Sequence, residues 1–181
     1  MTRWIVLAGE IGSGKTTAVL AAVELLAERG VQSLGVVGQP VIGVAGRRVG
    51  IDAVDLGSGR RRRLAAWVGS AGQVCPAYEF KARAFAWARA ALRGALAARP
   101  ELLVLDEIGP LELRHEQGYS EVLDALLRAD TPRVLVVVRE PLLPLLLERL
   151  FGRELTVLHL TADNRDQAPE QIQREVLRSR V

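Results

Sequence analysis

The apolar positions of this chain follow two alternating patterns. Short, mostly apolar runs are typical of strands that are buried on both faces, and they lie at 4–8, 34–37, 102–107, 134–138 and 154–160. Between them, apolar residues recur with helical spacing over 15–29, 79–98, 119–129, 142–151 and 170–178. This alternation predicts an α/β fold in which helices cover both faces of a mostly parallel central sheet, a three-layer sandwich.

The stretch 38–67 departs from this alternation. Its β-prone runs are short and are joined by glycine turns, which predicts an antiparallel β-meander inserted beside the parallel sheet. The connections 69–78, 108–113 and 161–167 are predicted to be loops. The chain shows no internal repeat or linker, so residues 1–181 are expected to form a single domain.

A glycine-rich segment follows the first predicted strand and precedes the first predicted helix. Its sequence at 9–16, Gly-Glu-Ile-Gly-Ser-Gly-Lys-Thr, fits the pattern G-x-x-x-x-G-K-[ST] of a phosphate-binding P-loop. Glycines open backbone conformations in which N–H groups of the loop and of the helix start converge on phosphate oxygens. The candidate nucleotide-binding residues of this segment are Gly9, Glu10, Ile11, Gly12, Ser13, Gly14, Lys15, Thr16 and Thr17.

Two side chains of this loop have specific predicted roles. Lys15 is expected to reach the β- and γ-phosphates and to take part in catalysis, and Thr16 is expected to ligate Mg²⁺. A dinucleotide-binding loop would need glycine where Ile11 stands. The remaining alternative is a glycine-rich turn that binds no ligand.

The strand at 102–107 ends on two carboxylates. Four apolar residues followed by Asp106 fit a Walker B pattern, and ligands of open α/β sheets bind beyond the carboxyl ends of the strands. Asp106 is therefore predicted to hold Mg²⁺ opposite Thr16, and Glu107 to orient or deprotonate the attacking water. The alternative is a pair of solvated acids that merely ends a strand.

Three further residues are weaker candidates. Arg139 directly follows the strand at 134–138 and could stabilise charge on the γ-phosphate as a catalytic residue; the alternative is a surface pair with Glu140. Asn164 and Arg165, after the last strand, are candidate contacts to the base or sugar, unless Asn164 only caps the final helix. The guanine signature N-K-x-D is not present there, so strict guanine selection is not expected.

Composition excludes several classes of protein. The 181 residues carry a formal net charge of +3, which is mild, and few aromatic residues accompany the run 60–63 (Arg60, Arg61, Arg62, Arg63). That run fits a solvated turn, a lid over phosphates or a weak nucleic-acid patch, and binding to nucleic acid is judged unlikely. Cys75 is the only cysteine, which excludes an internal disulfide. With no signal-peptide pattern and no membrane-spanning segment, a cytoplasmic protein is expected.

Five segments together resemble a known family, the small thermophile-type nucleoside-triphosphatases related to a human cancer-related nucleoside-triphosphatase. They lie in the family's order along nearly the whole chain, at 9–17, 48–51 (Arg-Val-Gly-Ile), 64–65, 106–112 (Asp-Glu-Ile-Gly-Pro-Leu-Glu) and 164–166. The resemblance implies one P-loop domain with Mg²⁺-dependent, slow hydrolysis of ATP, GTP and other NTPs. The chain departs from the family at 39–44, where an acid and an arginine are missing, and at Ile51, where an aromatic is common.

The leading hypothesis from sequence is therefore a Mg²⁺-dependent nucleoside triphosphate phosphohydrolase with ATP or GTP as substrate. Glu107 favours hydrolysis, because a water-activating acid is needed for that reaction and not for binding alone. One alternative is a kinase that transfers the γ-phosphate to a nucleotide or another small acceptor. The other is a nucleotide-dependent adapter; the sequence itself identifies no protein partner.

Overall fold

The protein is described by a computed structural model covering residues 2–69 and 77–178. Most of the predicted connection at 69–78, including Cys75, lies outside the described residues. One sheet of eight strands runs through it in the order β5-β4-β3-β2-β6-β7-β1-β8. The strands are β1 (Arg3–Gly9), β2 (Ser33–Ile42), β3 (Arg48–Asp55), β4 (Arg61–Gly69), β5 (Ala77–Phe80), β6 (Leu102–Ile108), β7 (Arg133–Arg139) and β8 (Glu154–Leu160).

The predicted parallel strands form one half of this sheet. β1 lies between β7 and β8 and pairs parallel with both, and β6 pairs parallel with β7 and with the start of β2. Successive β1 side chains enter opposite cores: Trp4 and Val6 belong to one hydrophobic cluster, and Ile5 and Leu7 to the other. Burial on both faces is what the continuous apolar runs predicted.

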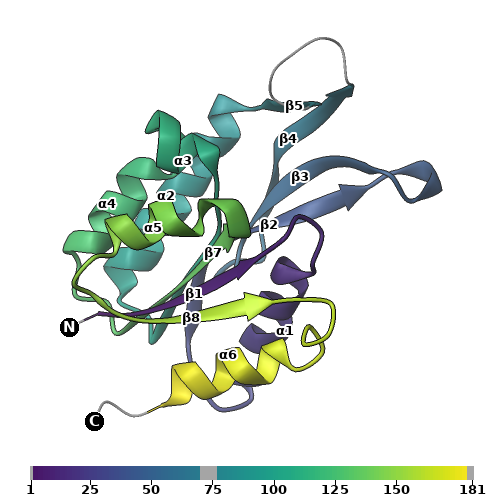
Figure 1. Cartoon of the computed structure of the whole chain (residues 1–181). Helices are drawn as coiled ribbons and strands as arrows, with labels where there is room; N and C mark the ends of the chain where they lie inside the picture. Colours follow the sequence, from purple (N-terminus) through teal and green to yellow (C-terminus); the bar gives the residue numbers. More distant parts are fainter. Residues whose placement is uncertain (1, 70–76, 179–181) are drawn as a thin grey trace.

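Helices cover both faces of the sheet, as predicted (Figure 1). Side chains of α1 (Lys15–Ala27) and α6 (Ala168–Leu177) belong to the cluster of Ile5, and those of α2 (Ala82–Ala98), α4 (Ser120–Arg128) and α5 (Leu143–Arg149) to the cluster of Trp4. Short helical turns lie at Val44–Gly46 and Glu140–Leu142. Among the described residues, no helix has the length and apolar character needed to cross a membrane.

The antiparallel meander continues the parallel half without a break. In β2, Ser33–Val36 pair parallel with β6, and the strand then runs on antiparallel to β3 as far as Ile42. The predicted strand at 34–37 and the first run of the predicted meander are thus one strand. β3, β4 and β5 follow in antiparallel order, so the meander reaches Phe80 and extends beyond the predicted end at residue 67.

Two local predictions were wrong. The helix expected from residue 79 begins at Ala82, because Ala77–Phe80 form ladder hydrogen bonds with β4 instead. The segment 108–113, expected to be a loop, instead leads into the short helix α3 (Pro110–His115). Pro110 fits the first turn of a helix, and the Glu112 carboxylate accepts a hydrogen bond from the Gly109 N–H and so satisfies a donor at the helix start.

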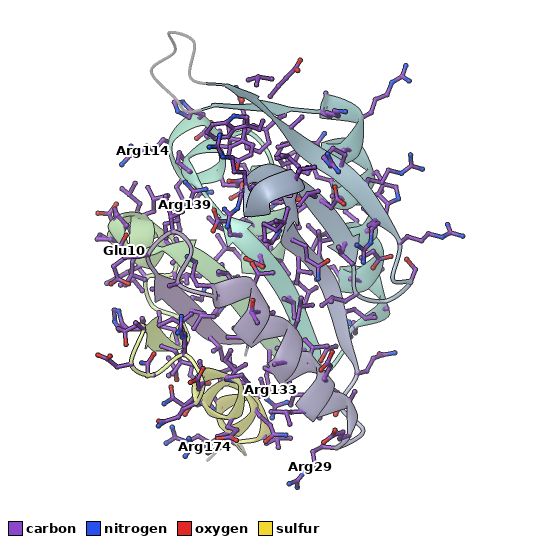
Figure 2. All side chains as sticks on the ribbon, turned by 90° about the vertical axis from the view of Figure 1, so that its right-hand side faces the viewer. Glu10, Arg29, Arg114, Arg133, Arg139 and Arg174 are labelled. Carbon is purple, nitrogen blue, oxygen red and sulfur yellow. The ribbon has the colours of Figure 1, made fainter. Side chains whose placement is uncertain are left out.

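The carboxyl ends of the parallel strands meet at one edge of the sheet. Figure 2 shows Arg139, at the end of β7, and Glu10, just after β1, on the same side of the molecule, far from Arg133 at the start of β7. The register of β6 on β7 shifts between Leu105 and Ile108, where Asp106 and Glu107 lie. The predicted site residues at the ends of β1, β6 and β7 are therefore neighbours in space.

Candidate active site

The loop after β1 has the backbone shape that its glycines allow. Gly12 and Gly14 have φ angles of +79° and +99°, a region that side chains disfavour. Gly9 is needed for a different reason, since a Cβ there would lie 2.8 Å from the carbonyl oxygen of Leu160 on β8. The loop then leads directly into α1 at Lys15.

Lys15 lies across the inside of this loop. Its ammonium donates hydrogen bonds of 2.8 Å to the carbonyl oxygens of Gly9 and of Glu10, and the residue is 6% exposed. Burial lowers the pKa of Lys15, while the nearby charges of Glu107 and Asp106 act in the opposite direction. The only cation of the loop is thus held at its centre by backbone oxygens and faces two acids.

Asp106 is a buried acid with spare hydrogen-bonding capacity. It is 2% exposed, and within the described part of the chain its Oδ2 atom has no partner. Burial raises the pKa of Asp106 to about 7, with the nearby Thr16 side chain opposing the rise and Glu107 adding to it. The Thr16 hydroxyl also lies 3.4 Å from the Gly38 carbonyl oxygen, to which it donates. Sequence reasoning placed Asp106 opposite Thr16, and the structure brings these two residues together.

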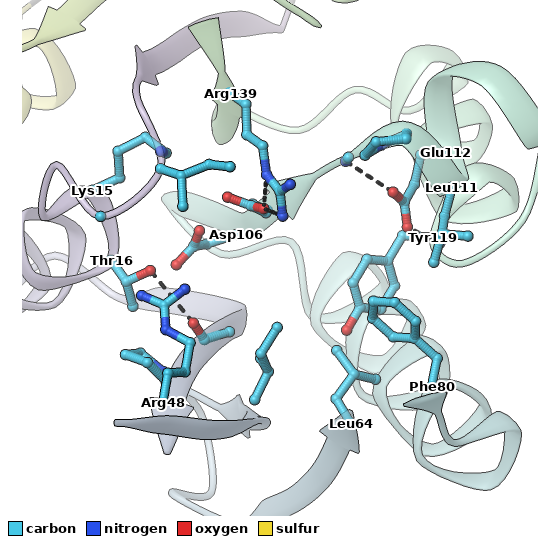
Figure 3. Close-up of a pocket in the computed structure, with 18 of the residues that line it drawn as sticks. Lys15, Thr16, Arg48, Leu64, Phe80, Asp106, Leu111, Glu112, Tyr119 and Arg139 are labelled. Carbon is cyan, nitrogen blue, oxygen red and sulfur yellow. Dashed lines mark hydrogen bonds and ion pairs between the residues drawn. The ribbon is translucent and has the colours of Figure 1, made fainter. Parts of the chain in front are cut away.

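Glu107 and Arg139 form an ion pair across neighbouring strands. Both Nε and one terminal nitrogen of Arg139 donate to Oε1 of Glu107, at 2.7 and 2.6 Å. The alternative partner considered for Arg139, Glu140, instead contacts Nδ1 of His159 at 3.0 Å. The arginine is therefore directed into the site, where it fixes the orientation of Glu107 (Figure 3).

These side chains border one open cavity of about 260 Å³. Its polar wall includes Lys15, Thr16, Asp106, Glu107 and Arg139, and the loop residues Ile11, Gly12, Gly14 and Thr17 also line it. The opposite wall is mostly apolar and is built by the meander, by helices α2 and α3, and by Tyr119 just before α4. Gly9, Glu10 and Ser13 belong to the loop but do not line the cavity.

Asn164 and Arg165 are not brought to this cavity. The Asn164 side chain closes the turn after β8, accepting a hydrogen bond from the Thr161 N–H and donating one to the His159 carbonyl oxygen, both at 2.8 Å. It does not cap α6, which begins at Ala168 with no side-chain cap. Arg165 is exposed, and its nearest acid, Asp166, is 4.0 Å away.

The arginine run 60–63 also lies outside the cavity. Arg63 pairs with Asp52 on β3 at 2.6 Å, and the guanidinium of Arg62 lies 5.9 Å from the centre of the Trp87 ring. None of the four arginines lines the cavity. This geometry gives no support to a lid that contacts phosphates.

Sequence reasoning assigned no role to four residues that line the cavity. Arg48, at the start of β3, is exposed and, among the described residues, has no ion-pair partner; Figure 3 shows its guanidinium turned toward Thr16. Glu112, Tyr119 and Phe80 form part of the far wall. Arg48 and Glu112 stood inside segments that resembled the family, but no pattern in the residues alone showed that they face the P-loop.

Comparisons with known proteins agree with this architecture. A family model described as NTPase matches residues 4–173. The chain is 30% identical to nucleoside-triphosphatase THEP1 of Methanopyrus kandleri, over 98% of this chain and 97% of that protein. It is 34% identical to nucleoside-triphosphatase THEP1 of Thermofilum pendens, over 94% and 93%.

Solved structures share the fold. A human cancer-related nucleoside triphosphatase superposes with a TM-score of 0.76 at 27% identity, over 99% of this chain and 100% of that one. THEP1 from Aquifex aeolicus matches with the same TM-score at 23% identity, over 97% and 99%. The predicted α/β P-loop fold with its meander is thus confirmed, and so is the family resemblance drawn from sequence.

Proposed function

The chain belongs to the NTPase family, and from this premise we propose that it transfers the γ-phosphate of ATP, GTP and other NTPs to water with Mg²⁺ as cofactor. The observation that carries the proposal is the meeting of three groups in one cavity: the P-loop with Lys15, the buried Asp106 beside Thr16, and Glu107. Phosphate binding, metal binding and water activation each have a suitable group there.

The triphosphate is proposed to lie along the P-loop and the start of α1. Unpaired N–H groups at a helix start and the positive end of its dipole favour phosphate oxygens. Lys15 already lies at the centre of the loop. When a triphosphate binds, the Lys15 ammonium would donate to the β- and γ-phosphates in place of the two backbone carbonyl oxygens. Arg48, which has no partner among the described residues, adds a second positive charge on the same side.

The Mg²⁺ ion is proposed to be held by Thr16 and Asp106. The residues fit this ion, because a hydroxyl and a carboxylate are oxygen ligands and one buried Asp106 oxygen has no partner in the described chain. Among the described residues, no group of three or more His, Cys, Asp or Glu has metal-site geometry. Mg²⁺ does not need such a group, because it commonly takes one or two protein ligands and completes its shell with phosphate oxygens and waters. When bound, Mg²⁺ supplies charge neutralisation at the phosphates.

Glu107 is proposed to accept the proton of the attacking water. It lies near the end of β6 next to Asp106, is half-buried, and is oriented by Arg139 from the neighbouring strand. Arg139 is in reach of the same space, so it can also stabilise negative charge that develops on the transferred phosphoryl group.

Phosphate release from ATP, GTP, CTP and UTP with Mg²⁺, measured beside the variant Glu107→Gln, tests this proposal. We expect slow release from several NTPs and a loss of about 100-fold or more in the variant, the usual size for removal of a general base. Affinity for the Mg²⁺–NTP complex should be retained, because Gln keeps the size of the side chain.

Glu140→Gln is the matched control, since Glu140 follows the neighbouring strand but pairs with His159 outside the cavity. It should leave the rate of release close to the wild-type rate. Equal loss of NTP affinity and of turnover in Glu107→Gln would contradict a role as base and would indicate a metal ligand or a structural residue.

A further inference from the structure

The cavity next to the P-loop has two chemically different halves. The charged half was assigned above to phosphates and Mg²⁺. The other half is formed by side chains from five elements, with the meander on one side and helices on the other, and its walls are Ile51, Leu64, Phe80, Phe85, Leu111 and Tyr119. The triphosphate bound along the P-loop would not fill this half, because its charged groups would have to be buried against these walls at a high cost in free energy.

Charged groups are not available to a ligand in this apolar half. Its one acid, Glu112, is 3% exposed, and its two carboxylate oxygens accept 2.9 Å hydrogen bonds from the backbone N–H groups of Gly109 and of Tyr119. Arg48 is turned toward Thr16 and away from Leu64 and Phe80 (Figure 3). The occupant of this half therefore has no need of a charge.

Tyr119, which lines this half, carries a buried hydroxyl. The residue is 2% exposed, and within the described chain its hydroxyl has no hydrogen-bond partner. Burial raises the pKa of Tyr119 well above its ordinary value, so the hydroxyl stays protonated. A buried hydroxyl without a partner is costly, and in Figure 3 its oxygen points toward Leu64 at the apolar wall.

We propose that the apolar half of the cavity is a binding site for a second small molecule, an uncharged and mainly apolar ring compound, held beside Glu107 at the phosphate end of the nucleotide site. The aromatic walls suit such a ligand: Phe85 contacts both Phe80 and Tyr119, with ring centres 5.6 and 5.2 Å apart. The whole cavity measures about 260 Å³, below the usual range of small-molecule sites, and the phosphates take part of it, so the occupant has at most one or two rings.

Binding of 2-naphthol, indole and cyclohexanol, followed by ligand-observed NMR and calorimetry without nucleotide, tests the site. We expect saturable binding of at least one probe, with intermolecular NOEs to ring protons of Phe80 or Tyr119. Phe80→Ala should weaken that binding about 10-fold, because a partly exposed aromatic wall is removed. Phe80 is 43% exposed, so this variant is expected to fold.

Phe151→Ala is the matched control, since Phe151 is 91% exposed and does not line the cavity; it should leave probe affinity unchanged. Absence of saturable binding by all three probes, or equal weakening by both alanine variants, would overturn the proposal. The test does not depend on NTP hydrolysis. Lys15→Ala should still bind the probe, so failure of the second site is distinguishable from failure of the proposed P-loop function.

Discussion

Four charged side chains share the small space behind the P-loop. Lys15 and Arg139 balance Asp106 and Glu107, and burial acts on them in opposite directions: it lowers the pKa of Lys15 and raises that of Asp106. Each charge is tolerated because another lies close to it. Removal of one member should therefore affect both ligand binding and the protonation of its neighbours.

Lys15→Ala is expected to abolish NTP binding and turnover, because it removes the only cation of the loop. Lys81→Ala is the matched control: it replaces the only other lysine of the chain, which is exposed just before α2. NTP affinity measured by calorimetry, with circular dichroism to verify folding, separates the two variants. Normal turnover in a folded Lys15→Ala protein would refute the P-loop assignment.

The pKa of Asp106 predicts how stability depends on pH in the protein without metal or nucleotide. The pKa rises from 3.8 to about 7 on folding, so between these values the folded state holds a proton that the unfolded state has lost. The free energy of unfolding should then decrease as pH rises from 4 to 7, by at most about 4 kcal/mol for a shift of this size.

Urea unfolding across this pH range, with EDTA present, measures the decrease. Asp106→Asn should show a much smaller decrease and should be the more stable protein at pH 7 and above, because it carries no buried charge. A pH dependence that is the same in both proteins would show that other groups control it.

At the scale of elements, the close contact between β2 and β6 brings the meander to the site. β2 changes from parallel to antiparallel pairing along its length, so the same strand connects β6, which carries Asp106 near its end, with β3, which begins at Arg48 and carries Ile51. Gly35 makes this contact possible: its φ is +137°, and a Cβ there would lie 2.0 Å from the carbonyl oxygen of Val104 on β6.

Gly35→Ala is therefore expected to lower the free energy of unfolding by about 2–4 kcal/mol, through backbone strain and a clash with β6. Gly94→Ala is the contrasting variant. Gly94 lies inside α2, and a Cβ there would meet nothing within 4 Å, so this change should stabilise the protein by about 0.5–1 kcal/mol. Chemical denaturation of both variants measures the difference, and a neutral Gly35→Ala would show that β2 and β6 can separate without cost.

At the scale of the whole molecule, a buried arginine ties the two ends of the chain together. Arg3 on β1 donates a 2.6 Å hydrogen bond to Glu175 on α6 and lies 3.7 Å from Glu154 on β8; its side chain is 8% exposed. Thr156 on β8 also donates to Glu175. The C-terminal helix is thereby fixed to the strand that leads into the P-loop.

Glu175→Ala should cost about 2–4 kcal/mol in the free energy of unfolding, because it leaves the buried Arg3 guanidinium with two longer contacts, to Glu154 and to the carbonyl oxygen of Arg178. Glu121→Ala removes an ion pair of similar length with Arg93, but both of those side chains are more than half exposed, so the expected cost is below about 1 kcal/mol. Thermal and urea unfolding compare the variants. Similar costs for the two would mean that burial of Arg3 contributes little.

The sequence by itself determined the parallel half of the fold and the composition of the P-loop. Apolar runs long enough to be buried on both faces, and glycines at fixed spacing before Lys15, are local patterns that restrict the backbone directly. Asp106 and Glu107 could also be found this way, because the carboxyl end of a buried strand is recognisable without knowing its neighbours.

Only the tertiary structure decided which side chains face one another across strands. It joined Arg139 to Glu107 instead of Glu140, left Asn164 in a local turn, and brought Arg48, Phe80 and Tyr119 to the cavity. Contacts between residues far apart in the sequence depend on sheet order and register, and no periodicity of the chain encodes those. The same limit explains why the end of the meander was missed, since β5 forms by pairing with β4. The short helix α3 was missed although Pro110 and Glu112, within the helix itself, carry a local signal for its start.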